Sequence, residues 1–455
     1  MKVQVKSLNP KFDRILSETI SVCPECLERV SAQYVTRNDI VYLKKACPHH
    51  GEFSVKVWTG ARDFVEWLGS EDNSLPDIRS GKDLAGCPGD CGGCDAHRQE
   101  TCCVLLEVTS RCNLSCPVCF ASSGAQDAED PSLSTIAGWY DMLMANGGPF
   151  NIQLSGGEPT MRDDLPEIIR LGKERGFSFF QLNTNGLRIA SQPDYLKEIA
   201  DAGLNTVFLQ FDGLSEASGL ALRGADLLEA KKRAIEVCGE IGVGVVLVPT
   251  VARGVNDAEL GAVLRFAADN MPSVRGVHFQ PVSFFGRCEL QAMNAARITI
   301  PELLGSIESQ MDGLLHKADF RPSNTEHPLC GFHATYTVSG GKWTLQKSEN
   351  SSCCIPSSKA RTIVARKWSA ARPASSPSGS KYGTQSLDEF LVMRQEKTLA
   401  LSGMAFQDAW TMDLKRLQRC YIGEVSPQGQ LIPFCAYNLS AADGSTLYRG
   451  RTDRP

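Results

Sequence analysis

The sequence predicts an α/β protein whose centre is a partial (β/α)6 barrel, flanked by an N-terminal zinc-ribbon or rubredoxin-like module and a C-terminal auxiliary iron–sulfur domain. Three observations predict this architecture. Strand-like apolar runs alternate with helix-like amphipathic runs between residues 104 and about 287. Polar residues and glycines follow the ends of these apolar runs. The 18 cysteines fall into groups with metal-ligand spacings.

Size and composition exclude several classes of protein. A chain of 455 residues has room for two or three domains, and 42% hydrophobic with 22% charged residues is typical of soluble globular proteins. A net charge of -5 without a long basic run argues against nucleic-acid binding. Residues 1–11 lack the apolar core of a secretion signal, and the longest apolar run, 242–252, is shorter than the about 20 residues of a membrane span. We expect a cytoplasmic protein with at most peripheral membrane contact, and the bunched cysteines fit a reducing compartment.

The barrel is predicted from six strand–helix units between residues 104 and 287. The expected strands are 105–109, 151–154, 178–183, 206–211, 244–251 and 276–281. The expected helices include 132–145, 164–175, 193–202, 226–241 and 257–270. Functional groups of such barrels gather at the carboxyl ends of the strands. Glu158, Asn185, Gln210, Asp212 and Gln280 fall there.

Before the barrel, two short knuckles have the spacing of a mononuclear metal site. The first is a CxxC pair and the second follows about twenty residues later in Cys47-Pro48-His49-His50. Each knuckle supplies two ligands from one tight turn, so the four converge tetrahedrally. The expected ligands are Cys23, Cys26, Cys47 and His50, with His49 the competing choice. The residues leave zinc and iron open as the metal.

A second cysteine group lies just before the first barrel strand. Cys87, Cys91 and Cys94 have the spacing CxxxCxxC, and Cys102 and Cys103 follow. Adjacent residues of an extended segment point to opposite faces, so we expect only one of this pair to bind metal, and we choose Cys102. Four cysteines would close an auxiliary [4Fe-4S] cluster suited to electron transfer or structure.

A third group, Cys112, Cys116 and Cys119, repeats the CxxxCxxC spacing in a short loop after the first barrel strand. A cubane cluster has four irons, so three thiolates from one loop leave one iron open for chemistry. The alternative is a structural zinc site with a distant fourth ligand.

This loop, followed in order by Gly156-Gly157-Glu158-Pro159 and Thr184-Asn185-Gly186, resembles the radical SAM superfamily over roughly the middle 200 residues. In that family the loop binds a [4Fe-4S] cluster whose open iron is chelated by S-adenosylmethionine (SAM). Electron transfer from the cluster cleaves SAM and leaves a 5′-deoxyadenosyl radical. The resemblance implies an enzyme in which Cys112, Cys116 and Cys119 are the catalytic ligands.

The resemblance also implies contacts to SAM, although capping and turn roles are the ordinary alternative for these residue types. Gly156 and Gly157 would leave room for the methionine part, and Glu158 would accept its amino group. The other expected SAM or substrate contacts are Phe120 near the adenine, Asn185 at the ribose or carboxylate, Gln210 and Asp212 at the ribose or substrate, and Arg253 at the carboxylate.

The C-terminal part carries a further set of cysteines. Cys420 and Cys435 flank a hairpin-like turn, and with Cys330 and either Cys353 or Cys354 they would make a second auxiliary [4Fe-4S] site; we choose Cys354. Free buried thiols are the alternative. The Ser- and Pro-rich stretch 370–386 is expected to be flexible. The expected division is 1–80 (metal ribbon), 81–103 (auxiliary segment), 104–300 (barrel) and 301–455 (C-terminal domain).

The order of these groups along the whole chain resembles the tetraether lipid synthase branch of the superfamily, and most closely its TrsS-type (seleno)proteins. This resemblance implies hydrogen abstraction from an unactivated C–H bond of a lipid or acyl chain, with a redox partner such as ferredoxin or flavodoxin. Two alternatives stay open: a radical SAM enzyme that modifies a peptide or protein, and a non-catalytic multi-cluster electron carrier.

Overall fold

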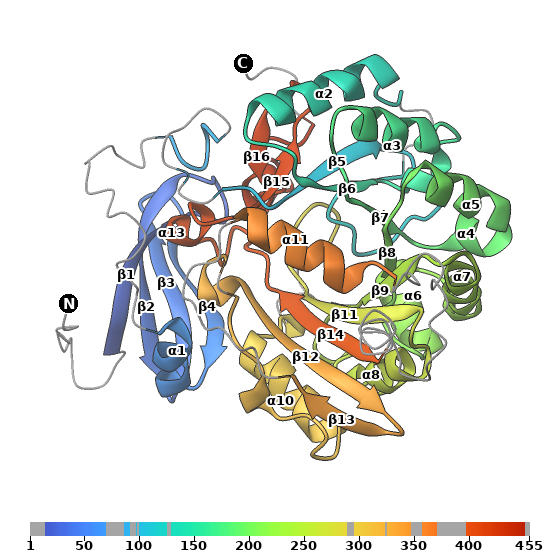
Figure 1. The fold of residues 1–455 in the computed structure, drawn as a ribbon. Helices are drawn as coiled ribbons and strands as arrows, with labels where there is room; N and C mark the ends of the chain where they lie inside the picture. Colours follow the sequence, from blue (N-terminus) through green and yellow to red (C-terminus); the bar gives the residue numbers. More distant parts are fainter. Residues whose placement is uncertain are drawn as a thin grey trace.

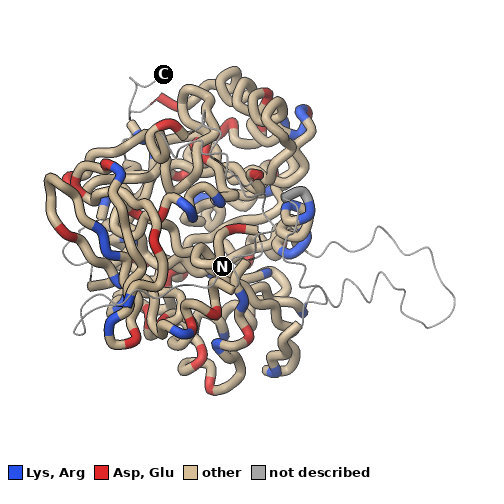
Figure 2. The backbone as a smooth tube through the Cα atoms, turned by 90° about the vertical axis from the view of Figure 1, so that its left-hand side faces the viewer, with Lys and Arg blue, Asp and Glu red and all other residues tan. Residues whose placement is uncertain are grey.

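The computed structural model describes residues 14–69, 86–91, 97, 100–124, 129–288, 295–323, 325–346, 357–370 and 397–450. A four-stranded N-terminal sheet stands beside a large curled sheet, and helices cover the outer face of the large sheet (Figure 1). Acidic and basic residues are interspersed in the view of Figure 2. In the described parts of the chain, no helix is long and apolar enough to cross a membrane.

The N-terminal sheet is an antiparallel meander of four consecutive strands. They are β1 (Arg14–Val22), β2 (Arg29–Arg37), β3 (Ile40–Cys47) and β4 (Gly51–Thr59). Helix α1 (Ala61–Leu68) closes one face of the sheet, because its buried Phe64 packs against Tyr34 and Trp58 with ring centroids 5.4 and 5.9 Å apart. This small core fixes the knuckles that carry the expected metal ligands.

The barrel strands are parallel neighbours in the order β5-β6-β7-β8-β9-β11, as predicted. They are β5 (Cys103–Thr109), β6 (Asn151–Gly156), β7 (Phe180–Thr184), β8 (Thr206–Gln210), β9 (Gly244–Val248) and β11 (Val274–Pro281). The predicted strand 244–251 is divided, since β10 (Thr250–Val251) starts only after Pro249. Proline has no N–H to donate to a ladder, which explains the break.

Helices connect the strands and cover the sheet from outside. They are α2 (Leu133–Ala145), α3 (Leu165–Glu174), α4 (Leu187–Ser191), α5 (Pro193–Ala202), α6 (Glu216–Arg223), α7 (Leu228–Ile241), α8 (Leu260–Asp269) and α10 (Ile300–Gln310). Short 3-10 turns are η1 (Pro159–Met161), η2 (Lys317–Asp319) and η3 (Pro328–Cys330). Helix α2 begins where Ser132 accepts from the Thr135 N–H, and α10 begins with a reciprocal cap between Thr299 and Glu302.

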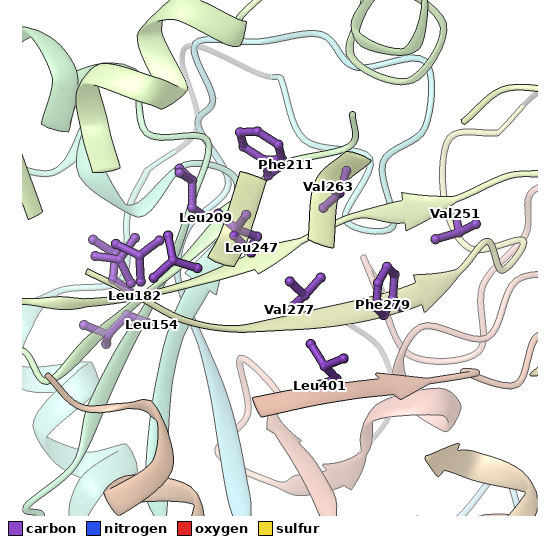
Figure 3. Close-up of a cluster of buried hydrophobic side chains, with 14 of the residues drawn as sticks. Leu154, Leu182, Leu209, Phe211, Leu247, Val251, Val263, Val277, Phe279 and Leu401 are labelled. Atoms are coloured by element: carbon purple, nitrogen blue, oxygen red, sulfur yellow. The ribbon is translucent and has the colours of Figure 1, made fainter. Parts of the chain in front are cut away.

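The two faces of the barrel sheet differ in character. Apolar side chains on neighbouring strands form one outer row beneath the helices: Leu154, Leu182, Leu209, Leu247, Val277 and Leu401 (Figure 3). Side chains alternate along a strand, so the residues next to them face the barrel interior. These inner residues include half-buried polar side chains and apolar ones; the polar ones are Gln153, Asn183, Gln210, His278, Gln280 and Ser402, and the apolar ones include Phe208, Val246 and Val248. The barrel therefore has an apolar outer layer and an inner wall that carries several polar side chains.

Strands from the C-terminal part extend this sheet at both edges. Beyond β11 lie β14 (Thr398–Met404), which is parallel to it, and then β12 (Gly331–Ser339) and β13 (Lys342–Leu345). At the other edge β15 (Ile422–Val425) runs parallel to β5 and pairs with β16 (Leu431–Pro433). Short helices α13 (Leu414–Leu417) and α14 (Phe434–Tyr437) flank this hairpin. That residues 301–455 form a separate domain stays a prediction. The strands of this segment belong to the same sheet as the barrel strands.

Helix α11 (Ser357–Trp368) lies across the amino-terminal ends of the barrel strands. Trp368 packs edge-on against the inner Phe208, with centroids 4.7 Å apart, and a side chain on Gly244 would collide with the Trp368 carbonyl. Arg361 donates to the carbonyls of Thr101 (2.7 Å) and Pro149 (2.8 Å). The helix thus closes the barrel floor. The predicted flexible stretch lies, after residue 370, outside the described residues.

Candidate functional site

The cluster loop, residues 112–119, follows the carboxyl end of β5 and brings three thiols together. Cys116 is buried and Cys112 and Cys119 are half-buried. Burial raises the pKa of Cys112 to about 11, and the neighbouring Cys116 and Cys119 add to this rise. Three close thiols on one loop fit a cubane cluster, whose binding releases their protons.

The loop is fixed by the chain that follows β11. Cys119 and Arg287 exchange two backbone hydrogen bonds of 3.0 Å, and Arg287 Nε donates to the Cys116 carbonyl at 2.7 Å. Gly286 allows this approach, because a Cβ there would lie 2.5 Å from the Phe120 carbonyl oxygen. Cys116 and Cys119 are therefore held in place by the chain that follows β11.

The two glycines after β6 make room for the chain itself. A Cβ on Gly157 would lie 2.1 Å from the Arg111 carbonyl oxygen, and one on Gly156 would lie 2.1 Å from that of Thr109. Gly156 also has a φ of +116°, which favours glycine. We expected these glycines to leave space for SAM; their observed role is to bring the end of β6 against the start of the cluster loop, and contact with SAM stays a prediction.

Glu158 is buried and connects the ends of two strands. One carboxylate oxygen accepts from Thr160 Oγ1 (2.6 Å) and Thr184 Oγ1 (2.7 Å), and the other from the Asn185 N–H (2.8 Å). Asn185 in turn donates to Asn113 of the cluster loop at 2.7 Å. Burial raises the pKa of Glu158, and these hydrogen bonds oppose the rise. Its predicted bond to the SAM amino group has no structural test, and its observed bonds position Asn185.

Asp212, at the end of β8, is buried and ion-paired with Arg223. Two hydrogen bonds of 2.7 Å join the carboxylate and the guanidinium, and the Thr250 N–H donates to the same carboxylate at 3.0 Å. Arg223 also donates to the Val118 carbonyl of the cluster loop at 3.1 Å. Lys231 Nζ lies 4.0 Å from Asp212. Arg223 lowers the pKa of Asp212 against the effect of burial.

Sequence reasoning missed Arg223 and Lys231, which join the loop to the barrel. A carboxylate that closes an apolar strand was the available signal, because a buried charge needs a partner. The predicted ribose contacts of Asp212 and of its half-buried neighbour Gln210 stay predictions.

Two further expected SAM contacts lie at the barrel mouth with protein partners. Arg253 forms an ion pair of 2.6 Å with Glu302, and its Nε donates to the Arg297 carbonyl at 3.3 Å. Phe120 packs on Phe434 with centroids 5.7 Å apart. Their contacts with the SAM carboxylate and adenine stay predictions.

The structure brings the expected ligands of the N-terminal metal together. One ligand atom from each of Cys23, Cys26, Cys47 and His50 lies within 4.8 Å of the others. His49, the competing choice, is exposed and lies 4.0 Å from Glu28. Two thiols from one knuckle and a thiol with an imidazole from the other form a donor set that fits a mononuclear zinc or iron ion.

The two auxiliary sites are described only in part. Cys87 and Cys91 are buried and share an apolar cluster with Cys103. We chose Cys102 as their fourth partner, but the first residue of β5 is Cys103, and it is this side chain that packs in the same cluster. Arg361 and Glu326 lie near both Cys102 and Cys103, so the choice of Cys102 as the fourth ligand stays a prediction. Cys94 lies outside the described residues.

Cys330, Cys420 and Cys435 form the second partial set. The three thiols lie close enough to raise one another's pKa, in addition to the larger effect of burial. Arg416 Nη2 lies 3.5 Å from Cys330 Sγ. Cys353 and Cys354 lie outside the described residues, so the fourth ligand stays a prediction.

Comparison with known proteins agrees with this geometry. Residues 106–267 match the model of the Radical SAM superfamily, and residues 15–59 match the HMPTM N-terminal zinc ribbon domain. The 7,8-dihydro-6-hydroxymethylpterin dimethyltransferase of Methanocaldococcus jannaschii is 35% identical over 92% of this chain and 93% of its own length. The mitochondrial GTP 3′,8-cyclase of Arabidopsis thaliana is 31% identical over 39% of this chain and 45% of its own.

Solved structures resemble the chain over about half its length. SuiB of Streptococcus suis bound to S-adenosylmethionine is 16% identical, with a TM-score of 0.37 over 47% of this chain and 48% of its own. Methylornithine synthase is 15% identical, with a TM-score of 0.37 over 47% of this chain and 63% of its own.

Proposed function

We propose that the chain, which belongs to the radical SAM superfamily and to the family of the M. jannaschii dimethyltransferase within it, methylates a pterin or a closely related fused heterocycle. The observation that carries this proposal is the 35% identity over 92% of this chain and 93% of that enzyme. The alignment is long enough to include the ribbon, the barrel and the C-terminal strands together, so the likeness is not limited to the common barrel.

A pterin replaces the lipid substrate that we expected from the resemblance to tetraether lipid synthase. The curated relatives reported above are named for a pterin and for GTP. The inner wall of the barrel supports this change, because Gln153, Asn183, Gln210 and Gln280 place four carboxamides on it. Carboxamides can pair with the donors and acceptors of a heterocycle, whereas an acyl chain offers them no hydrogen bond.

The residues of this chain have three tasks in the proposed reaction. Cys112, Cys116 and Cys119 would hold a [4Fe-4S] cluster, which when bound supplies the electron for SAM cleavage. Glu158 and Asp212 act through other groups: Glu158 orients Asn185, and Asp212 orients Arg223 against the loop. Asn185, Gln210, Phe120 and Arg253 remain our proposed contacts to SAM or substrate.

The auxiliary cysteines would hold two further [4Fe-4S] clusters. We assign Cys87, Cys91, Cys94 and Cys102 to one, with Cys103 as the alternative fourth ligand, and Cys330, Cys354, Cys420 and Cys435 to the other. Buried thiols next to the barrel are suited to pass electrons from a donor such as ferredoxin or flavodoxin to the SAM cluster. The ribbon would hold one zinc or iron ion.

The test is anaerobic turnover by the reconstituted protein. Dithionite, SAM and 7,8-dihydro-6-hydroxymethylpterin should yield 5′-deoxyadenosine with methionine from the SAM that is cleaved. They should also yield a pterin heavier by one or two methyl groups, each supplied by a further SAM molecule that leaves as S-adenosylhomocysteine, and mass spectrometry measures these products. Cys116→Ala should abolish both 5′-deoxyadenosine and the methylated pterin, because the cluster loses a ligand. A cluster-loaded protein that forms 5′-deoxyadenosine but leaves the pterin unmodified would contradict the proposed substrate.

A further inference from the structure

An open groove of about 580 Å³ separates the N-terminal ribbon from the mouth of the barrel. The edge strand β4 forms one wall through residues 52–56. The other wall comes from the chain after β10, with Arg253, and from Arg297 and Trp410. Apart from Arg253, none of the residues that line this groove is among the expected contacts to SAM.

Three cations line the groove, against one carboxylate, that of Glu52. Lys56 and Arg253 both pair with Glu302 at 2.6 Å, and Arg297 Nη2 donates to the buried Asp408 at 2.8 Å. These acids are not among the residues that line the groove, so they fix the cations behind its surface. Burial alone would raise the pKa of Glu302, but its hydrogen bonds outweigh burial and lower this pKa to about 2. The carboxylate therefore stays charged.

Arg297 is the most buried of the three cations. Its side chain is only 8% exposed, and among the described residues its Nε has no hydrogen-bond acceptor. A buried guanidinium N–H without an acceptor is costly, and an anion in the groove would supply one. Three basic side chains from three separate segments make a built site, unlike a run of surface lysines.

The groove is also close to the reacting centre. Trp410 packs edge-on against Phe284 with centroids 5.5 Å apart. Both belong to an apolar cluster that includes Val118 of the cluster loop. The groove therefore shares an apolar cluster with the loop that would carry the SAM cluster, and Trp410 and Phe53 give the groove aromatic surface.

We infer that this groove binds the anionic group, a phosphate or a carboxylate, of a pterin substrate whose ring enters the barrel. This inference deepens the proposed function and rests on it for the identity of the ring. It also gives the ribbon a task, since Lys56 of β4 completes the site. The preference for an anionic over an uncharged pterin would come from charge-assisted hydrogen bonds to Lys56, Arg253 and Arg297.

The test compares ligands on the anaerobically reconstituted holoenzyme by calorimetry. The ligands are 7,8-dihydro-6-hydroxymethylpterin, its phosphate ester, dihydrofolate with its glutamate carboxylates, and inorganic pyrophosphate as a probe without a ring. We expect the phosphate ester or the carboxylate-bearing pterin to bind at least about tenfold more tightly than the uncharged alcohol, and the stronger of the two identifies the anion. Pyrophosphate should also bind.

Variants show whether the preference for anions depends on the groove cations or on positive charge elsewhere on the protein. Lys56→Gln and Arg297→Gln should each remove most of the anionic preference, whereas Arg265→Gln, whose residue pairs with Asp312 and does not line the groove, should keep it. Lys56 is partly exposed, so its variant decides the matter if the buried Arg297 variant fails to fold.

Three results would overturn the inference: no preference for anions in the wild type, a preference unchanged in Lys56→Gln, or weakened binding of SAM itself in the groove variants. The last would make the groove part of the SAM site. Anion binding in the groove without pterin methylation would contradict the proposed function but support the anion site. Methylation of the uncharged pterin without a preference for anions would support the proposed function but contradict the anion site.

Discussion

At the residue scale, Arg223 shows how a buried charge can organise a loop. Its guanidinium is shared between the carboxylate of Asp212, the hydroxyl of Thr250 (2.8 Å) and the carbonyl of Val118. Since the ion pair is buried, each partner depends on the other for the solvation it has lost. The same contacts that satisfy the charges also hold the cluster loop on the barrel.

Replacing Arg223 with leucine should therefore both destabilise the protein and weaken cluster retention. The variant leaves Asp212 with only the more distant Lys231 as cationic partner, and we expect a loss of about 3 kcal/mol of unfolding free energy. Chemical denaturation and iron analysis measure the two effects. Arg233→Leu on α7, which removes an exposed ion pair with Glu236, is the control and should change neither. Equal iron content in both variants would refute this role.

We expect His278 to make the free energy of unfolding decrease at acidic pH. Burial lowers its pKa from 6.5 to about 4. Between these values the unfolded chain binds a proton that the folded chain does not, so the unfolding free energy falls as the pH falls from about 6.5 to about 4. Its contribution between pH 7 and 5 is at most about 2 kcal/mol, because the ring keeps some solvent contact.

The prediction for His278→Gln is a flatter dependence of stability on pH over this range. Glutamine preserves a hydrogen bond with Ser402, which lies 2.9 Å from His278 Nδ1, and does not titrate. Urea unfolding of both proteins at about pH 7 and about pH 5 gives the difference, from which acid effects common to both cancel. Parallel curves for the two proteins would show that another group causes the sensitivity.

At the element scale, the end of β6 is placed by two glycines that allow backbone contact with the cluster loop. Gly157→Ala should displace the loop, because the new Cβ would meet the Arg111 carbonyl at 2.1 Å. We expect at least a tenfold loss of 5′-deoxyadenosine formation and a lower iron content. Gly138→Ala in α2 has open space around it and should be neutral or slightly stabilising. Full activity of Gly157→Ala would show that the loop adapts.

Local patterns in the sequence were sufficient to predict the barrel strands and most of their helices. The alternation that buries Leu154 and Leu182 is visible within each strand, and the CxxC and CxxxCxxC spacings identify metal knuckles without a structure. For strands that lie outside the alternating strand–helix region, the pairing partners were not predictable. Nothing near residue 422 indicates that it pairs with Cys103, since that register depends on the whole sheet.

The same reason explains the gaps in the predicted site. Asp212 and Glu158 were found from their positions after apolar runs, but their partners come from other segments. Arg223 lies on a separate helix, and Arg297 lies in a segment that had no recognisable motif. Trp368 was also missed. Its helix α11 precedes a Ser- and Pro-rich stretch and packs against barrel strands that lie far from it in the sequence.

At the scale of the whole molecule, the ribbon is docked on the C-terminal segment by buried polar contacts. Thr19 and Tyr34 donate to the two carboxylate oxygens of Asp413 at 2.6 and 2.7 Å. Lys45 Nζ donates to the Ala409 carbonyl at 2.6 Å. The ribbon is therefore part of the rigid frame that positions Trp410 beside the barrel mouth.

Removing the ribbon metal should loosen this frame without abolishing SAM cleavage. Cys26→Ser deletes one ligand of the compact site, and folding of such knuckles depends on their metal. We expect loss of one mononuclear metal per chain, faster proteolysis within residues 14–59, and a KM for the pterin raised about tenfold or more. Uncoupled 5′-deoxyadenosine formation should persist. An unchanged KM would show that the ribbon does not shape substrate binding.

The pairing of β15 with β5 has a consequence for biosynthesis. The first barrel strand is made well before β15, its neighbour on one side, because a long stretch of chain separates the two. Until then β5 is an unpaired edge next to two cysteine-rich loops, a state prone to association with other chains. The C-terminal cysteine set, which includes Cys435 of α14, is therefore complete only after β15 has been made. A nonsense codon even shortly before residue 422 would leave every upstream motif intact and yield a protein that aggregates.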